Sequence, residues 1–178
     1  NFFYSEKDYT KALQYFKKVD FSGLGSEQQT QGHFKWGYSC FNLKKLDEAL
    51  EQFNAVKIQS SQYSPAANYY AGFIEYSKGM YDEALLDLKR AESNASYSGI
   101  VPSLIANVLY KQKKYDELIQ YASTLESRVE KISNYAEVSM LVADAYFFKK
   151  DYKNAAVAYE KYLEDNASKA EGSVLFRA

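Results

Sequence analysis

The chain has 178 residues and a formal net charge of −1; 47% of its residues are hydrophobic and 25% are charged. This balance is typical of a folded protein and excludes a disordered chain. The near-zero charge excludes the broad basic surface that nucleic-acid binders need, and no apolar run approaches the ~20 residues that cross a bilayer. We therefore expect no nucleic-acid partner and no direct membrane insertion.

Amphipathic patterning with only eight glycines and two prolines predicts long helices joined by short turns. Two segments that begin at Ser26 and Ser168 match capping boxes, and Ser64-Pro65 matches an N-cap followed by proline at the first helical position. The chain opens in the tail of a helix, at Phe2-Phe3-Tyr4. In chain order, further helices are expected at about 8–20, 26–43, 46–58, 64–78, 81–94, 99–112, 115–129, 133–149 and 151–165, and a last one begins near 168.

One sequence design recurs in five of these helices. Each carries a small or aliphatic anchor residue, and the anchors are Ala12, Ala49, Ala84, Leu118 and Ala155. Successive anchors are separated by 37, 35, 34 and 37 residues. A small residue also lies 12 positions before four of the anchors, at Gly37, Gly72, Ala106 and Ala143. The repeating unit is therefore a helical hairpin of fixed internal length, in which small residues allow two antiparallel helices to pack closely.

The residue four positions after the anchor is large in four segments, which gives the pairs Ala12/Phe16, Ala49/Phe53, Ala84/Leu88 and Ala155/Tyr159. This A-x3-F pattern, repeated at close to ~34 residues, resembles the tetratricopeptide repeat. The resemblance covers essentially the whole chain and implies an all-α fold, an α-α superhelix formed by a solenoid of antiparallel helical hairpins. The pair Leu118/Ala122 is inverted in size, so its repeat is degenerate. Cys40 and Glu75 stand where the family has tyrosine.

On this pattern residues 1–178 form a single solenoid. It would comprise a partial repeat at 1–24, full repeats at about 26–61, 64–96, 99–131 and 133–166, and a partial repeat at 168–178. Apolar residues occur at both ends of the chain, including Val174, Leu175 and Phe176, whereas solenoids need polar capping repeats. We therefore expect the chain to be a fragment of a larger multi-repeat protein.

In tetratricopeptide repeats the first helix of each hairpin lines the concave face. The expected inward stripe begins three residues before each small residue and continues at i+4 and i+7, which is one face of a helix. This stripe predicts a partner-binding groove formed by Phe34, Tyr38, Phe41, Tyr69, Phe73, Tyr76, Asn107, Tyr110, Asp144 and Phe147. Ser103 and Met140 complete the stripe, which is aromatic in its first half and mixed in its second.

Two interpretations of the aromatic half stay open. The rings form a groove for an apolar helix or an extended peptide, since aromatic side chains offer a large contact area with few torsions to freeze. Alternatively, they pack between neighbouring helices, because stacking buries many such residues in solenoids. If the groove exists, a segment of the same parent protein is a further candidate to occupy it. Some members of the family hold chaperone tails with lysine and asparagine, but Asn107 is the only matching amide, which argues against that role.

Residues with catalytic or metal-binding chemistry are scarce. His33 and Cys40 are the only histidine and cysteine, whereas a zinc site needs about four ligands. Acidic pairs such as Asp47 and Glu48 are adjacent on a helix and point in different directions. The sequence contains no phosphate-binding, zinc-protease or nucleophile-elbow motif. We expect no catalytic residue, no metal and no cofactor, and therefore no enzymatic activity.

The sequence thus favours a protein–protein interaction scaffold from a larger bacterial repeat protein. It would bind a peptide or a helix in the aromatic groove. The alternatives are a regulatory input module of a larger signalling protein and a glycan-binding module, in which exposed rings stack on sugars. The tyrosine- and lysine-rich composition resembles that of long bacterial repeat proteins of the cell envelope. This resemblance favours the periplasm or cell envelope over the cytoplasm.

Overall fold

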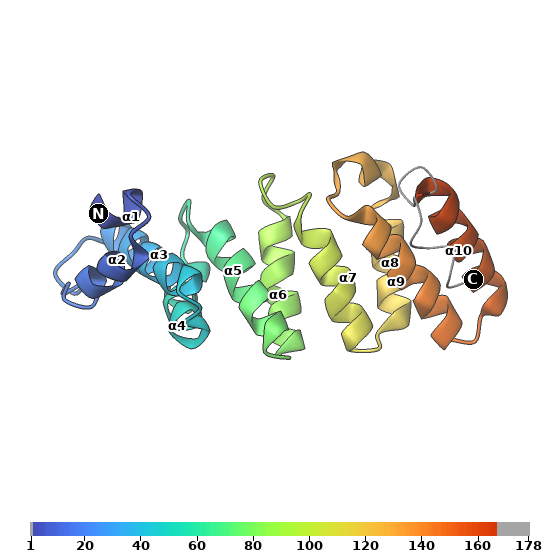
Figure 1. Ribbon diagram of the computed structural model, residues 1–178, viewed down its shortest axis with the longest axis horizontal. Coiled ribbons are helices and arrows are strands. Elements are labelled where there is room, and N and C mark those ends of the chain that lie inside the picture. Colours follow the sequence, from blue (N-terminus) through green and yellow to red (C-terminus); the bar gives the residue numbers. More distant parts are fainter. Residues whose placement is uncertain (1, 167–178) are drawn as a thin grey trace. The chain divides into compact units, whose positions relative to one another are not determined.

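All regular structure in the described part of the chain, residues 2–166, is helical in the computed structural model (Figure 1). The chain divides into two compact units, Asn1–Tyr97 and Ser98–Ala178. The helices of the first unit are α1 (Phe2–Ser5), α2 (Tyr9–Phe16), α3 (Ser26–Asn42), α4 (Leu46–Lys57), α5 (Ser64–Ser77) and α6 (Tyr81–Glu92). Those of the second are α7 (Val101–Lys111), α8 (Tyr115–Ser123), the 3-10 helix η1 (Glu126–Lys131), α9 (Tyr135–Phe148) and α10 (Tyr152–Asn166).

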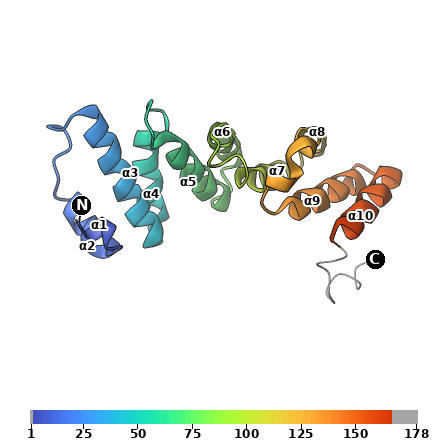
Figure 2. The ribbon, with the colours of Figure 1, turned by 90° about the horizontal axis from the view of Figure 1, so that it is seen from above.

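Short turns join the helices into antiparallel hairpins, and within each unit every α-helix packs on its neighbours along the chain. Figure 2 shows α3, α4 and α5 side by side in the first unit. The helices predicted at 26–43, 46–58, 64–78, 81–94, 99–112, 133–149 and 151–165 are confirmed to within about two residues at each end. The capping box at Ser168 and the helix predicted after it lie outside the described residues. A single solenoid over 1–178 stays a prediction.

Two helices are shorter than predicted. α2 ends at Phe16 and not near residue 20. At that position the Asp20 carboxylate accepts hydrogen bonds from the N–H of Ser22 at 2.9 Å and from its hydroxyl at 2.7 Å, which stabilises a turn. α8 ends at Ser123 and not near residue 129. The hydroxyls of Ser123 and Thr124 donate to carbonyls three residues earlier, at 2.8 and 2.6 Å. Such bonds compete with the backbone bonds that continue a helix.

Two N-caps lie one residue earlier than predicted. α3 is capped by Gly25, whose N–H donates to the Gln28 side chain at 3.3 Å, so the predicted cap Ser26 is already helical. α5 is preceded by Tyr63, and the predicted cap Ser64 is its first helical residue. The Ser64 hydroxyl donates to the Gln59 carbonyl instead of capping the helix. In both cases a local hydrogen bond replaces the expected serine cap.

Gly37 and Gly72 lie where helices approach closely, as the constant spacing predicts. A Cβ atom on Gly37 would lie 3.0 Å from a ring carbon of Phe53. A Cβ atom on Gly72 would lie 2.8 Å from Cγ of Leu88. Both distances are shorter than ordinary van der Waals contact, so the missing side chain is what permits this approach of first and second helix.

The core of the first unit lies between α2, α3, α4 and α5. It consists of small and aliphatic residues around one fully buried ring, that of Phe53. Its buried members are Leu13, Cys40, Ala49, Leu50, Phe53, Val56, Ala67, Ala71 and Ile74. Half-buried rings, including Phe34 and Tyr70, pack against its edge. The aromatic face of the unit therefore rests directly on the core.

A buried charged cluster links α4, α5 and α6. Lys57 Nζ lies 3.3 Å from Glu75 Oε1 and 2.5 Å from Asp87 Oδ2. Glu75 and Asp87 are only 2% and 1% exposed, and a guanidinium nitrogen of Arg90 lies 3.4 Å from Asp87. Burial and the neighbouring Asp87 carboxylate raise the pKa of Glu75 to about 7, despite the opposing effect of Lys57. The sequence pattern marked Glu75 only as a departure from the repeat.

The turn between the two helices of a hairpin needs a residue with left-handed backbone geometry. Gly79 takes this conformation in one turn, with φ of 76°. Lysines take it in the other turns of the described region: Lys7, Lys44, Lys113 and Lys150. A side chain makes this conformation unfavourable by about 1–2 kcal/mol, whereas glycine adopts it freely.

Replacing Lys150 with glycine is therefore expected to stabilise the protein by about 0.5–1 kcal/mol. The gain is smaller than the conformational strain because glycine also loosens the unfolded chain. Urea unfolding of Lys150→Gly measures it. Lys161→Gly in the middle of α10 is the matched control, and it should instead lose about 1 kcal/mol. Destabilisation by both substitutions would contradict the assignment of strain to Lys150.

Candidate functional site

The predicted aromatic stripe of the first unit splits into packed and exposed rings. Phe34 stacks on Tyr63 at a centroid distance of 5.1 Å and lies 5.9 Å from the core ring of Phe53. Tyr38 meets Tyr4 and Tyr9 at 5.9 Å each. These two members of the stripe hold α3 against α1, α2 and α4, as the packing interpretation expects.

Tyr70 is the centre of the aromatic face, and sequence reasoning missed it. Its ring lies 5.4 Å from Tyr38, 5.0 Å from Phe41 and 5.2 Å from Tyr69. It also stacks on Phe53 at 5.4 Å, which anchors it to the core. The stripe rule selected Tyr69 and passed over the next residue, because it assigns a single helix face. The Tyr69-Tyr70 pair was the available signal.

Phe41, Phe73, Tyr69 and Tyr76 form the outward part of this face. Phe73 is 37% exposed and has Phe41 as its ring neighbour, at 5.9 Å. Tyr69 lies 5.1 Å from Tyr97, and Tyr76 lies 6.1 Å from Tyr81 at the start of α6. We call Tyr38, Phe41, Tyr69, Tyr70 and Phe73 the aromatic surface, because their rings form one continuous set of contacts across α3 and α5.

The hydroxyl groups of Tyr69 and Tyr70 stay protonated, since burial raises the pKa of both. They therefore offer neutral hydrogen-bond donors. Cations flank the rings: Lys35 Nζ lies 5.6 Å from the Tyr4 centroid, and Lys44 Nζ lies 5.9 Å from that of Phe41. Within residues 3–164 neither lysine forms a salt bridge, so both charges are available to a ligand.

In the second unit the stripe is mixed, and its polar members Asn107 and Asp144 link helices. The Asn107 side chain on α7 donates to the carbonyl of Ser103 at 2.9 Å and to Glu137 of α9 at 2.8 Å. Asp144 on α9 accepts a hydrogen bond from the Tyr159 hydroxyl of α10. Burial, together with this Asp144 contact, raises the pKa of Tyr159. These contacts occupy groups that the sequence assigned to a partner.

The two aromatic members of the second stripe lie at the ends of their helices. Tyr110 lies in the last turn of α7, and its ring lies 6.0 Å from that of Tyr115 and 6.2 Å from that of Phe148. Phe147 is exposed and meets Phe148 at 5.8 Å and Tyr152 at 5.6 Å. These rings gather around the hairpin turns, and Tyr110 also reaches Asp144: burial, followed by the charge of Asp144, raises the pKa of the Tyr110 hydroxyl.

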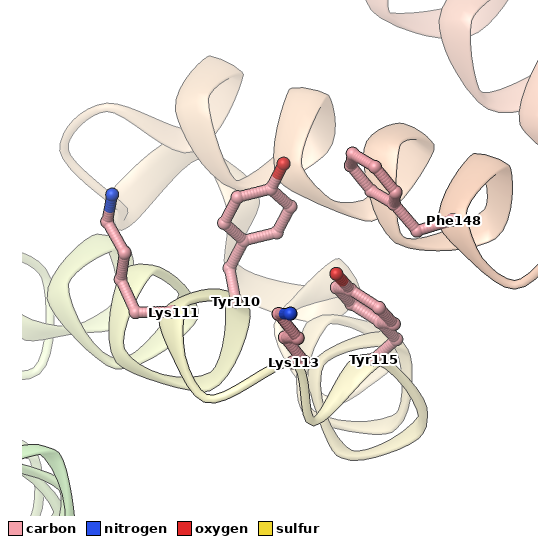
Figure 3. A pocket seen from close by; sticks show the side chains of 5 residues that line it. All are labelled: Tyr110, Lys111, Lys113, Tyr115 and Phe148. Carbon is pink, nitrogen blue, oxygen red and sulfur yellow. The ribbon is translucent and has the colours of Figure 1, made fainter.

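An open cavity of about 410 Å³ lies beside Tyr110 (Figure 3). Figure 3 shows its lining side chains, which come from the end of α7, the following turn, the start of α8 and the end of α9: Tyr110, Lys111, Lys113, Tyr115 and Phe148. Tyr115 and Phe148 stack at 5.7 Å with an interplanar angle of 12°. The rings of Tyr115 and Phe148 pack against one another, and the side chains of Lys111 and Lys113 are exposed to solvent. The cavity is therefore a shallow hollow at the turn between α7 and α8.

His33 and Cys40 both serve packing. His33 Nδ1 lies 2.8 Å from Gln52 Oε1, and its ring stacks on Phe21 at 4.8 Å. Burial raises the pKa of the Cys40 thiol to about 12, so it is a poor nucleophile. Among the residues for which side chains are described, no cluster of acidic, histidine or cysteine residues is placed to hold a metal. No helix in that region is long and apolar enough to cross a membrane.

The hairpin architecture defines a class of fold, the tetratricopeptide-type helical repeat, and solved structures of that class superpose on the chain. The C-terminal part of a TPR repeat-containing protein from Cytophaga hutchinsonii matches 92% of this chain with a TM-score of 0.64 and 20% identity. The chain spans 62% of that protein's structure. MamA (residue 41 to its end) from Desulfovibrio magneticus RS-1 matches 91% of this chain, with 88% of its own length, a TM-score of 0.64 and 18% identity.

TPR-like repeats of a putative kinesin light chain from Podosopora anserina match 95% of this chain and 92% of their own, with a TM-score of 0.66 and 12% identity. Neither the family models nor the curated proteins gave a match. The predicted fold class, an all-α repeat of the tetratricopeptide type, is thus confirmed by structural similarity. The sequence identities to these structures, 12–20%, are low, and the two sequence comparisons found no match.

Proposed function

We propose that this chain is a protein-interaction scaffold and not an enzyme, and that the aromatic surface binds an amphipathic helix of a partner protein. The observation that carries the proposal is Phe73, a large ring that is 37% exposed on α5 yet continuous with rings that rest on the core. An exposed aromatic ring with a rigid support is the kind of side chain that dominates binding energy at interfaces.

The support beneath Phe73 favours binding because little motion has to be frozen. Phe41 touches both Phe73 and Tyr70, and Tyr70 stacks on the buried ring of Phe53. A partner side chain placed on Phe73 and Phe41 therefore meets a surface that is already ordered. Preorganisation of this kind reduces the entropic cost of association.

The lysines beside the rings define the charge of the partner. Lys35 and Lys44 flank the aromatic surface and form no salt bridge with residues 3–164. The fitting partner is a helix whose apolar residues recur at i, i+3 or i+4, and i+7, with aspartate or glutamate at the edges of that face. Binding should weaken as salt rises, because the lysine–carboxylate contacts are exposed to solvent.

Selection from a displayed library of random peptides, with the full chain as bait, tests this proposal. We expect selected sequences to carry apolar residues at helical spacing and flanking acidic residues. In NMR spectra of the chain, the best peptide should perturb the ring resonances of Phe41 and Phe73 and leave those of Phe147 in the second unit unchanged. Selection of basic or purely polar sequences, or perturbations away from α3 and α5, would count against it.

A further inference from the structure

The turn between α9 and α10 departs from the repeat at two positions. When the hairpins are aligned on their anchors, Phe148 stands where the three preceding hairpins have the polar residues Asn42, Ser77 and Lys111. Lys153 stands where they have Asp47, Asp82 and Asp116. The first turns of α4, α6 and α8 each carry two acidic residues, whereas that of α10, like that of α2, carries none. The α9–α10 turn is therefore more apolar and more basic than those of the three preceding hairpins.

The helix dipole does not account for Lys153. Positive charge is unfavourable in the first turn of a helix, whereas an aspartate such as Asp116 is favourable there. The acidic residue of the turn, Asp151, is held by Asn154, whose backbone N–H and side-chain amide donate to it at 3.2 and 2.7 Å. Local stability thus does not favour Lys153, whereas contact with a negatively charged ligand would.

Three aromatic rings are half exposed at this turn. Phe147, Phe148 and Tyr152 are 50%, 53% and 59% exposed. The ring of Phe147 lies 5.8 Å from that of Phe148 and 5.6 Å from that of Tyr152. Phe148 also stacks on Tyr115, at the start of α8, at 5.7 Å (Figure 3). The rings therefore form one apolar patch that is supported by the neighbouring hairpin.

Lysines outnumber acidic residues around this patch. The segments 110–117 and 147–154 contain six lysines and three acidic residues, and Asp116 is already paired with Lys149. Four of the lysines are exposed and form no salt bridge with residues 3–164, namely Lys111, Lys113, Lys150 and Lys153. We call these four lysines and the three rings the turn surface, which combines an apolar patch with net positive charge.

We propose that the turn surface binds the headgroup region of a membrane that contains anionic lipids. Aromatic rings and lysines are the side chains that favour this region, because rings enter the boundary between headgroups and acyl chains while ammonium groups meet lipid phosphates. Figure 1 shows the α7–α8 and α9–α10 turns at the same end of the second unit, so one flat surface can meet both. Such contact is peripheral and requires no helix that crosses the bilayer. It does not depend on the aromatic surface of α3 and α5.

Co-sedimentation of the full chain with vesicles tests the proposal. We expect the chain to pellet with vesicles of equal parts phosphatidylcholine and phosphatidylglycerol, and to stay in solution with vesicles of phosphatidylcholine alone. The bound fraction should fall as the salt concentration rises from about 0.05 to about 0.5 M, because salt screens the contacts between lysines and headgroups. No pelleting with the anionic vesicles, or equal pelleting with both, would overturn the proposal.

A matched pair of charge variants locates the contact. Three lysines of the turn surface are neutralised in the first variant by Lys111→Gln, Lys150→Gln and Lys153→Gln. This variant should bind the anionic vesicles at least about tenfold more weakly. The control removes the same charge from exposed lysines of the first unit by Lys7→Gln, Lys18→Gln and Lys89→Gln. It should weaken binding at most about twofold, since these lysines lie outside the turn surface. Equal losses in the two variants would reduce the effect to net charge and contradict a specific surface.

A second pair of variants tests the rings. Phe147→Ser with Phe148→Ser should weaken binding to the anionic vesicles at least about tenfold, because the apolar patch is lost. Tyr15→Ser with Leu86→Ser removes residues of the first unit that are likewise half exposed, at 51% and 53%, and should leave binding unchanged. Circular dichroism verifies that each variant is folded. Full binding by the folded Phe147→Ser, Phe148→Ser variant would exclude the rings from the contact.

NMR spectra of the unmodified chain separate a membrane from an acidic protein as the partner. Anionic bicelles that carry a spin-labelled lipid should broaden the ring resonances of Phe147 and Phe148 and leave those of Phe41 and Phe73 unchanged. Broadening at Phe41 and Phe73 instead would assign the contact to the aromatic surface. If polyglutamate perturbs Phe147 and Phe148 while the anionic vesicles do not bind, the turn surface recognises acidic protein segments, and the membrane proposal is wrong.

Discussion

Replacing Lys57 with methionine is expected to destabilise the first unit by about 3–5 kcal/mol at pH above the pKa of Glu75, where this carboxyl is ionised in the unmodified chain. The substitution removes the ammonium group that lies between Glu75 and Asp87, both almost fully buried. Arg90 approaches Asp87 at 3.4 Å, so the Glu75 carboxylate would be left without a cation. Urea unfolding followed by fluorescence measures the loss, and Trp36 on α3, the single tryptophan, reports on this unit.

The matched control neutralises the whole cluster. A triple variant with Lys57→Met, Glu75→Gln and Asp87→Asn leaves no buried charge in the cluster, so it should recover most of the lost stability. Arg90 is half exposed and can hydrate. Equal destabilisation of the single and triple variants would show that packing of the Lys57 side chain, and not its charge, stabilises the junction of α4, α5 and α6.

The same cluster makes the first unit pH-dependent. Because the pKa of Glu75 is about 7 in the folded protein and 4.5 ordinarily, the folded protein binds this proton more tightly than the unfolded chain. The resulting stability is complete below about pH 4.5 and is lost as pH rises through about 7. Glu75→Gln should therefore flatten the decline in urea midpoint between about pH 5 and about pH 8. An unchanged decline would assign it to other groups.

Truncating Phe53 to alanine is the other change with a large expected effect, a loss of about 3–5 kcal/mol. Phe53 is fully buried, fills the gap left by Gly37 and supports the rings of Phe34 and Tyr70. Because α3 and α5 both rest on it, the measured loss should lie at the upper end of this range. Urea unfolding gives the value.

Leu50→Ala on the same helix is the control for loss of apolar volume, since Leu50 is a buried aliphatic residue of the same core. It should cost less than Phe53→Ala, about 2–3 kcal/mol. The near-UV circular dichroism of the tyrosines should also change more in Phe53→Ala, because Tyr70 loses its stacking partner. Equal losses of stability and no difference in the tyrosine signal would contradict the supporting role of Phe53.

The hairpin spacing was predictable because it depends on local rules. The constant distance from Gly37 and Gly72 to the next anchor reflects close helix approach, and a Cβ at either glycine would collide with the facing helix. The early ends of α2 and α8 were not predictable from periodicity. They depend on side-chain-to-backbone hydrogen bonds at Asp20, Ser123 and Thr124, which apolar patterns do not encode.

The candidate site was predictable only in part. Periodicity placed Phe41 and Phe73 on one face, and their rings are in contact. It also included Phe34 and Tyr38, which mainly hold α3 against its neighbours. It omitted Tyr70, since a stripe rule takes one residue of an adjacent pair. Distinguishing rings that pack from rings that bind requires distances between helices far apart in the sequence.

The buried cluster illustrates a different limit. Lys57, Glu75 and Asp87 belong to three helices and show no shared spacing, so their proximity arises only when α4, α5 and α6 pack. Ala122 is the opposite case. Its inverted pair with Leu118 was visible as a degenerate repeat, but the cavity of about 140 Å³ that Ala122 lines involves residues of α9 and α10, which the pattern did not connect to it.

Calorimetric titration of the best selected peptide into the unmodified chain, Phe73→Ala and Leu86→Ala is the most direct test of the proposed scaffold role. Leu86 is the control, since it is 53% exposed on α6 and lies outside the aromatic surface. We expect Phe73→Ala to weaken binding at least about tenfold, a change of about 1.4 kcal/mol, with little change in melting temperature. Leu86→Ala should bind as the unmodified chain does. Equal affinity of all three proteins would contradict the assignment of partner binding to the aromatic surface.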